Sequence, residues 1–154
     1  TYRNEVRGKF SEILETWIPK FYREGITLSV ETHVGGNVFL FNCLEEFSEY
    51  IAEYGHLGVL IDVSHNFNDG RTIHEILRIT ECLKITGLHL SDAVSGEEVK
   101  KGTHLPVGCG TIDFSDFLKP FANKNLYGAL EIISTSANIK ESLRRLKEHV
   151  NIRS

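Results

Sequence analysis

The sequence predicts an α/β fold in which a parallel sheet is built from repeated βα units. Helical and strand patterns alternate along all 154 residues, which is the order that such units require. The strand patterns are nearly continuous apolar runs, as expected where both faces of a parallel sheet are buried. No long linker or change of composition divides the chain, so residues 1–154 are expected to form a single domain.

Four apolar runs are the predicted strands. They are GITLSVETH from Gly25, LGVLIDVSH from Leu57, ITGLHLSD from Ile85 and LYGALEIIS from Leu126.

Five amphipathic segments are the predicted helices, because their apolar residues recur at three- and four-residue spacing. They cover residues 6–22, 44–54, 72–83, 114–121 and 138–150. Pro19 is expected to kink or end the first of them, since proline has no backbone N–H to donate.

Composition restricts the possible partners. The formal net charge of −4 shows no excess of basic residues, so a nucleic-acid partner is less expected than a small molecule. Three widely spaced cysteines without a CxxC pair fit a reducing compartment better than a disulfide framework. No apolar run approaches the ~18 residues of a membrane span, and we expect a cytoplasmic protein with no membrane partner.

Each apolar run carries a metal-binding residue type at or near its end. These residues are Glu31, Asp62, His89 and Glu131. The carboxyl ends of parallel strands meet at one edge of the sheet, where ligands gather. A carboxylate at the end of a buried strand is costly to desolvate unless it is paired or bound to a cation. The mixed oxygen and nitrogen set predicts a site for a divalent cation such as Mn, Zn, Co, Fe or Mg.

Three further residues are expected at the same rim. His65 follows Asp62 by three residues, Asp92 follows His89 by three, and His104 lies in the glycine-flanked GTHLPVGCG. The alternative for Asp62 and Asp92 is a structural one, because a strand-end carboxylate is often the N-cap of the next helix. His33 is interpreted as a surface or structural residue.

The combined motifs resemble the xylose-isomerase-like TIM barrel superfamily, which includes sugar isomerases, epimerases and the endonuclease IV class of apurinic-site nucleases. The matching segments are LSVETH, LIDVSHNFNDG, GLHLSDA, THLPVGCGTIDFSDFLK and YGALEI. The resemblance implies a TIM-barrel fold and metal ligands at Glu31, Asp62, His89 and Glu131. It also implies that His65 and His104 bind substrate, as in the isomerases, or a further zinc, as in the nucleases; Asp92 is expected to contact substrate beside them.

The chain departs from this family in two respects. The resemblance covers only the second half of the barrel, and four strands with open edges cannot close. A partner chain, a second copy in a homodimer or a missing half is therefore expected to complete it. The nuclease pattern also has Asp two residues before the loop histidine, where this chain has Gly102.

The resemblance implies a divalent-metal-dependent isomerase or epimerase for a sugar or sugar phosphate. In such an enzyme Glu31 or Glu131 moves a proton next to a metal-bound carbonyl as general base. Two alternatives stay open. One is a zinc-dependent apurinic endonuclease like endonuclease IV, and the other is a metal-binding half-barrel without catalysis.

Overall fold

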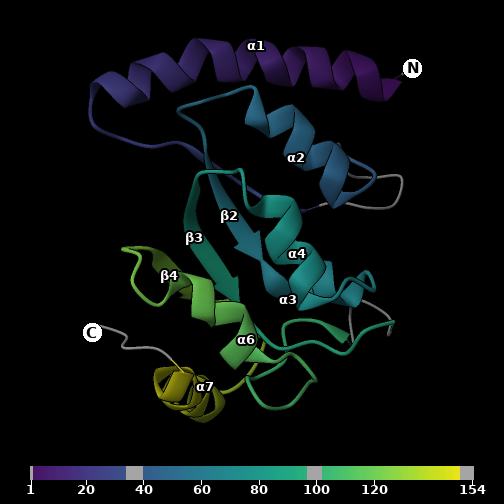
Figure 1. The fold of residues 1–154 in the computed structure, drawn as a ribbon, viewed down its shortest axis with the longest axis vertical. Coiled ribbons are helices and arrows are strands. Elements are labelled where there is room, and N and C mark those ends of the chain that lie inside the picture. The colour runs from purple at the N-terminus through teal and green to yellow at the C-terminus, as the bar shows by residue number, and fades with distance from the viewer. Residues whose placement is uncertain (1, 34–39, 97–101, 150–154) are drawn as a thin grey trace.

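The computed structural model describes residues 2–33, 40–96 and 102–149, and it contains one parallel four-stranded sheet in the order β1-β2-β3-β4 (Figure 1). The strands are β1 (Ser29–Glu31), β2 (Gly58–Asp62), β3 (Ile85–Leu90) and β4 (Tyr127–Leu130). The helices are α1 (Tyr2–Arg23), α2 (Leu44–Ala52), α3 (Val63–Asn68), α4 (Ile73–Thr80), α6 (Phe114–Leu118), η1 (Lys119–Phe121) and α7 (Ser136–His149).

The predicted α/β class and half-barrel topology are confirmed: each predicted strand and helix has a counterpart in order along the chain. Pro19 was expected to kink or end the first helix, and the second of these alternatives is wrong, because α1 continues through Pro19 to Arg23. The buried Leu14 and Ile18, which both precede Pro19, anchor the helix on the core, so the loss of one N–H donor near the end of a long helix is tolerated. The predicted end of the last helix at Val150 lies outside the described residues.

The short helix α3 follows β2 directly and was not predicted, since the residues Val63 to His65 were assigned to the end of the apolar run. Asp62 is its N-cap, with the carboxylate accepting a hydrogen bond from the backbone N–H of His65. The capping alternative for Asp62 is therefore confirmed. It does not exclude a second role, because the cap uses only one of the two carboxylate oxygens.

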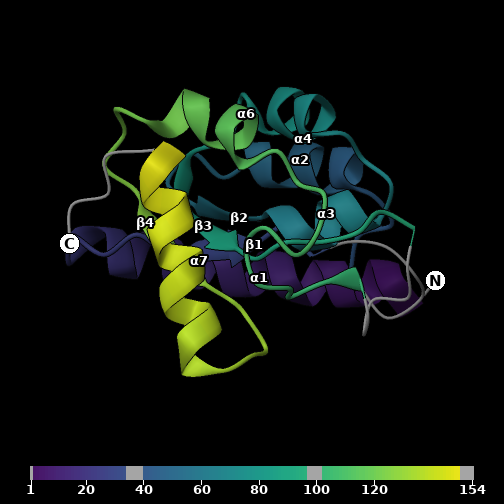
Figure 2. The same cartoon turned by 90° about the horizontal axis from the view of Figure 1, so that it is seen from below.

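The core lies between the middle strands and a row of helices. Figure 2 shows α2, α4 and α6 side by side over one face of the sheet. Val59 and Ile61 of β2 are fully buried, and they belong to one hydrophobic cluster with Phe47, Ile76 and Phe117 of the three helices. Burying a side chain of this size contributes about 1.5–3 kcal/mol, so this cluster anchors the middle of the sheet.

The outer strands are less covered than the middle ones. The expectation that both faces of each strand are buried is wrong for β4, in which Tyr127, Gly128 and Ala129 are exposed. The reason is that β4 pairs only with β3 and β1 only with β2. The helices α1 and α7 lie at opposite ends of the long axis of the molecule (Figure 1), which leaves the sheet open at two edges.

Two smaller expectations concern the whole chain. Cys43, Cys82 and Cys109 are free thiols, in agreement with the prediction that they form no disulfide framework. Among the described helices, none is long and apolar enough to cross a membrane.

Candidate metal centre

Four side chains from the four strands meet at the carboxyl edge of the sheet. They are Glu31, Asp62, His89 and Glu131. Each offers one ligand atom, and these atoms all lie within 4.8 Å of one another. A divalent cation bound at 2.0–2.4 Å, as is usual for nitrogen and oxygen ligands, needs donor atoms at about this mutual separation. The four residues predicted from the sequence are thus brought together.

Strand pairing explains why the four residues converge. Asp62 of β2 lies beside His89 of β3 in the parallel register. Glu31 is the last residue of β1. Glu131 directly follows β4 and continues its ladder, because its N–H donates to the carbonyl of Leu90 at 3.1 Å. The ligands therefore stand on backbone that the sheet holds in place, with one from each strand.

Asp62 occupies the most enclosed position of the four, with a side chain that is 0% exposed. Its Oδ1 accepts hydrogen bonds from the Ser64 hydroxyl at 3.0 Å and from the His65 N–H at 2.9 Å. Its Oδ2 is buried and has no hydrogen-bond partner. An unsatisfied buried carboxylate oxygen is rare in folded proteins, and here it lies within the ligand cluster. This is the observation on which the fit of a cation rests.

Thr32 and Asn66 hold the backbone around Asp62. The Asp62 N–H donates to the Thr32 hydroxyl at 3.0 Å, and the Asn66 amide donates to the same hydroxyl at 2.9 Å and to the Asp62 carbonyl at 2.7 Å. All three side chains are buried. The sequence analysis missed Thr32 and Asn66, although both lie within four residues of a predicted ligand.

His89 lies between the two glutamates. Its Nδ1 is 3.2 Å from Glu31 Oε1 and 3.2 Å from Glu131 Oε2. Because ionised carboxylates only accept hydrogen bonds, Nδ1 carries the proton in this arrangement, and a cation held by the cluster would take that proton's place. Burial raises the pKa of Glu31, an effect that His89 opposes and the negative charge of Asp62 strengthens. A positive charge at this point would relieve the repulsion between Glu31 and Asp62.

The residues present therefore fit a divalent cation: the donor set is mixed, the donors converge, and one buried carboxylate oxygen has no hydrogen-bond partner. Three carboxylates and one imidazole nitrogen suit Mn, Co, Zn or Mg more than a soft cation such as Cu(I).

His65 and His104 form a pair beside the cluster. Their Nε2 atoms are 3.1 Å apart, and His65 Nε2 is 4.0 Å from Asp62 Oδ2. His104 Nδ1 lies 3.0 Å from the carbonyl oxygen of Glu131, so Nδ1 carries the proton and donates. The Nε2 of a neutral His104 then accepts from the N–H of His65 Nε2, which fixes the tautomers of both rings. Burial lowers the pKa of His65, which favours the neutral form of the His65 ring.

His33 packs on the same histidine pair, with its ring centroid 4.4 Å from that of His65. His33, interpreted from the sequence as a surface or structural residue, lies two residues after the end of β1 and is half-buried.

Asp92 is not among the clustered ligands, and it is 1% exposed. Its Oδ1 accepts from the N–H groups of Ala93 and Ile112 at 2.9 and 3.1 Å, and its Oδ2 accepts from the Gly108 N–H at 2.8 Å. These contacts give Asp92 a structural task in the loop that carries His104. The prediction that Asp92 binds substrate has no support in them.

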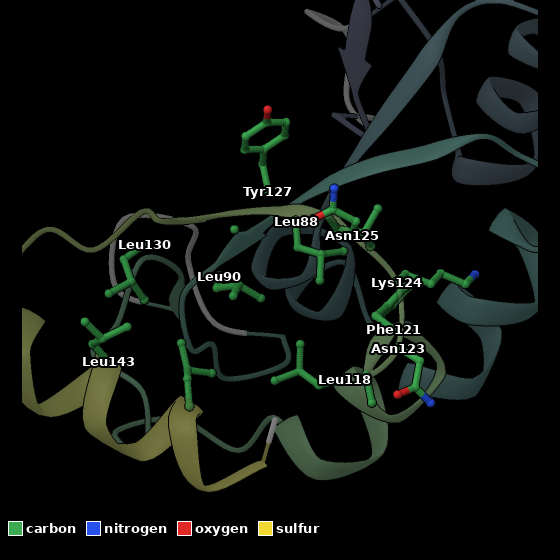
Figure 3. Close-up of a pocket in the computed structure, with 14 residues that line it drawn as sticks. Leu88, Leu90, Leu118, Phe121, Asn123, Lys124, Asn125, Tyr127, Leu130 and Leu143 are labelled. Carbon is green, nitrogen blue, oxygen red and sulfur yellow. The ribbon is translucent and has the colours of Figure 1, made fainter. Parts of the chain in front are cut away.

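A cavity of about 760 Å³ lies elsewhere. It separates the outer face of β3 and β4 from α6 and α7, and Figure 3 shows leucines from both sides pointing into it, while Tyr127 points away. None of the four clustered ligands lines it. Asn123, Lys124 and Asn125 also line it, and it lies beside the open edge of β4.

Comparison with known proteins shows similarity to one family model and to solved structures. Residues 1–149 match the family model described as "Xylose isomerase-like TIM barrel". A crystal structure of a "D-tagatose 3-epimerase-like protein" superimposes with a TM-score of 0.70 at 23% sequence identity. The superposition covers 92% of this chain and 52% of that one, so this chain spans about half the length of that structure. No protein of curated function matches the sequence.

Proposed function

The chain belongs to the xylose isomerase-like TIM barrel family, and on that premise we propose that it carries the metal centre of a divalent-metal-dependent isomerase or epimerase for a sugar or sugar phosphate. The supporting observation is the four-ligand cluster with the unpartnered Oδ2 of Asp62. The similarity of the fold to an epimerase-like protein points in the same direction. The cytoplasmic location stays a prediction.

Glu31, Asp62, His89 and Glu131 are the proposed ligands, and the cation they hold would polarise a sugar carbonyl and its neighbouring hydroxyl. Glu31 and Glu131 stand on opposite outer strands of the sheet, with His89 between them. Their free carboxylate oxygens can therefore approach a bound substrate from two sides. One of them removes the proton from the carbon next to the carbonyl, and the other is placed to return a proton on the opposite face.

The histidine pair would orient the substrate. His104 donates through Nδ1 to the carbonyl of Glu131, and His65 sits against Asp62, so both rings are fixed relative to the proposed ligands. Imidazole rings held in one orientation suit hydroxyl groups and phosphate oxygens as partners. Their roles as substrate-binding residues belong to the proposal.

The open edges of the sheet support a completing partner. A closed barrel of this type has eight strands, and the structure describes four. Among the described residues, the large exposed apolar side chains all lie at the two edges. They are Tyr2, Ile13, Trp17, Tyr22 and Ile26 on the β1 side, and Tyr127, Ile133, Ile139 and Leu143 on the β4 side. We propose that these edges bind four further βα units, supplied by a second copy of this chain or by a partner.

The test is the exchange of substrate protons with solvent deuterium, followed by NMR in the presence of Mn²⁺ across a panel of ketoses and ketose phosphates. Exchange is expected at the carbon next to the carbonyl, and it is lost in Glu131→Gln. Glu53→Gln is the control, because Glu53 is also exposed but lies at the end of α2, outside the cluster.

The same preparation distinguishes the remaining functions. Nicking of abasic DNA together with several tightly bound zinc ions per chain would replace the isomerase by a nuclease. If the assembled protein binds metal but exchanges the protons of no sugar in the panel, the non-catalytic half-barrel is the function that fits. The nuclease is disfavoured here because Gly102, which offers no side chain, stands where the nuclease pattern has Asp.

A further inference from the structure

The loop of residues 102–112 carries His104 to the rim, and its backbone is held by side chains from two other segments. His104 itself has a φ of +55°, which is unfavourable for a residue with a side chain unless its surroundings enforce it. The loop therefore needs fixed points close to His104.

The first fixed point is Asp92. Its backbone pairs with that of Leu105, the residue after His104, through N–H to O distances of 2.8 and 3.0 Å. Its carboxylate accepts from the N–H groups of Gly108 and Ile112 further along the loop. A single buried carboxylate thus binds the backbone of two separate residues, Gly108 and Ile112, in the loop that follows His104.

The second fixed point is α7, which forms hydrogen bonds with both the N–H and the carbonyl of Val107. The Val107 N–H donates to the Ser142 hydroxyl at 3.0 Å, and the Val107 carbonyl accepts from Arg145 Nη1 at 3.1 Å. Ser142 is fully buried. Arg145 is itself aligned by Glu141, one helical turn earlier, at 3.0 Å.

Gly108 shows how closely Arg145 approaches the loop. A Cβ atom added at Gly108 would lie 1.6 Å from Arg145 Nη1. The position therefore excludes a side chain for a reason beyond its φ of +86°. Any side chain there would push the guanidinium away from Val107.

We propose that Asp92, Ser142 and Arg145 are positioning residues that fix His104 against His65. We call these three residues the loop clamp. The loop clamp acts one to eight residues after His104, at Leu105, Val107, Gly108 and Ile112. It touches neither the proposed ligands nor the histidine rings in the contacts described above. Through it, the last helix of the chain determines where a rim histidine stands. The inference rests on the proposed substrate-binding role of His104.

The test reads the tautomers of His65 and His104 by two-dimensional ¹H–¹⁵N NMR of the imidazole rings in the metal-free protein, at a pH well above the ordinary histidine pKa. The wild-type protein should show one protonated and one unprotonated nitrogen in each ring. Arg145→Ala and Gly108→Ala should both lose this signature for His104, because a released ring averages its tautomers. Arg145→Lys, which keeps a donor for the Val107 carbonyl, should restore it in part.

Two matched controls separate the loop clamp from general damage. Arg144→Ala removes the neighbouring arginine of α7, which pairs only with Glu141 and Glu148 in the described contacts. Gly96→Ala strains a backbone of similar φ, +78°, but its Cβ meets nothing within 4 Å. Both should keep the wild-type histidine signature.

An unchanged His104 signature in both Arg145→Ala and Gly108→Ala would overturn the proposal. If Gly108→Ala does not fold, the pair Arg145→Ala and Arg145→Lys still decides it. The readout does not depend on metal or turnover, so a failure of the proposed sugar chemistry would leave these spectra as they are. In an active assembly, the same variants should raise KM more than they lower kcat.

Discussion

The two middle strands and the two outer strands of this sheet have the same topology but different surroundings. β2 and β3 are each paired on both sides, and Val59, Ile61 and Leu88 are buried beneath the helices. β4 is paired on one side, and Tyr127 at its start is 85% exposed. The same kind of apolar run therefore produces a core strand or an open edge, depending on what lies next to it.

The ligands follow the same division. Asp62, from the middle, has a side chain that is 0% exposed, whereas those of Glu31 and Glu131 from the outer strands are 32% and 45% exposed. The middle of the site is thus built entirely by this chain. Its outer ligands face the two edges at which the barrel is still open, so they are the part of the site that a completing partner would enclose.

The largest contrast is expected in the stability of the two kinds of strand. Ile61→Ala deletes a fully buried side chain of β2 and should lower the free energy of unfolding by about 2–5 kcal/mol. Tyr127→Ala on β4 should change it by no more than about 0.5 kcal/mol in the monomer. Urea unfolding followed by circular dichroism measures both. A large loss for Tyr127→Ala would show that this edge is covered in solution.

Metal affinity should divide in the same way. In Asp62→Asn the remaining carbonyl oxygen can still cap α3, but the unpartnered carboxylate oxygen is gone. We expect Mn²⁺ affinity to fall about 100-fold or more, since even the loss of a group that only supports a ligand costs 10–100-fold. The metal-free variant should be no less stable than the wild type, because a buried charge is removed.

Glu131→Gln provides the comparison at the edge, and its half-exposed position should limit the loss to about tenfold, since water can replace one oxygen. Titration calorimetry with Mn²⁺ measures both variants. Equal losses at the two positions would mean that the cation is not centred on the enclosed oxygen of Asp62.

The sequence was informative about the sheet and the ligands for one physical reason. Strand-end residues such as Glu31 and Asp62 are placed by the backbone direction of parallel strands, which an apolar run reveals. The predicted strands and the convergence of the four ligand residues follow from that rule alone. The family resemblance added the half-barrel topology.

The features that the sequence did not predict depend on contacts between residues that are not neighbours in a strand or helix pattern. Asp92 was predicted to contact substrate at the rim. In the structure its buried carboxylate accepts hydrogen bonds from backbone N–H groups up to 20 positions later in the chain. The exposure of β4 depends on its place at the edge of the described sheet, where it pairs only with β3. α3 escaped prediction because its first three residues, Val63 to His65, were assigned to the end of the run LGVLIDVSH, whereas the Asp62 cap marks the change from strand to helix.

Association of the chain with a second copy should depend on residues at the two edges of the sheet and not on those over its middle strands. Ile13 is 53% exposed on α1, and Ile13→Glu should weaken association about tenfold or more if the residue lies in the centre of the completing interface. His74→Glu on α4, whose side chain is 83% exposed, is the matched control and should leave association unchanged. Light scattering over a dilution series measures the mass. Equal weakening by both variants would place the contact outside the two edges.

The smallest contrast is expected between the caps of a middle helix and an edge helix. Thr72 begins α4 with a full capping box, in which its hydroxyl accepts from the Glu75 N–H and its own N–H donates to the Glu75 carboxylate. Thr135 precedes α7, and its hydroxyl accepts from the Asn138 N–H at 3.3 Å. Thr72→Ala should cost about 1 kcal/mol, as is typical of such caps, and Thr135→Ala about 0.5 kcal/mol.

Chemical denaturation of the two variants resolves this difference only if unfolding is cooperative through both the middle and the edge. If α7 unfolds before the core, Thr135→Ala will shift an early transition and leave the main one in place, because a cap contributes only to the unit that contains it. That outcome would show that the edge of the sheet, with the helix that holds the His104 loop, is a separate folding unit. A single shared transition would show instead that α7 is coupled to the core through Leu146, which is fully buried.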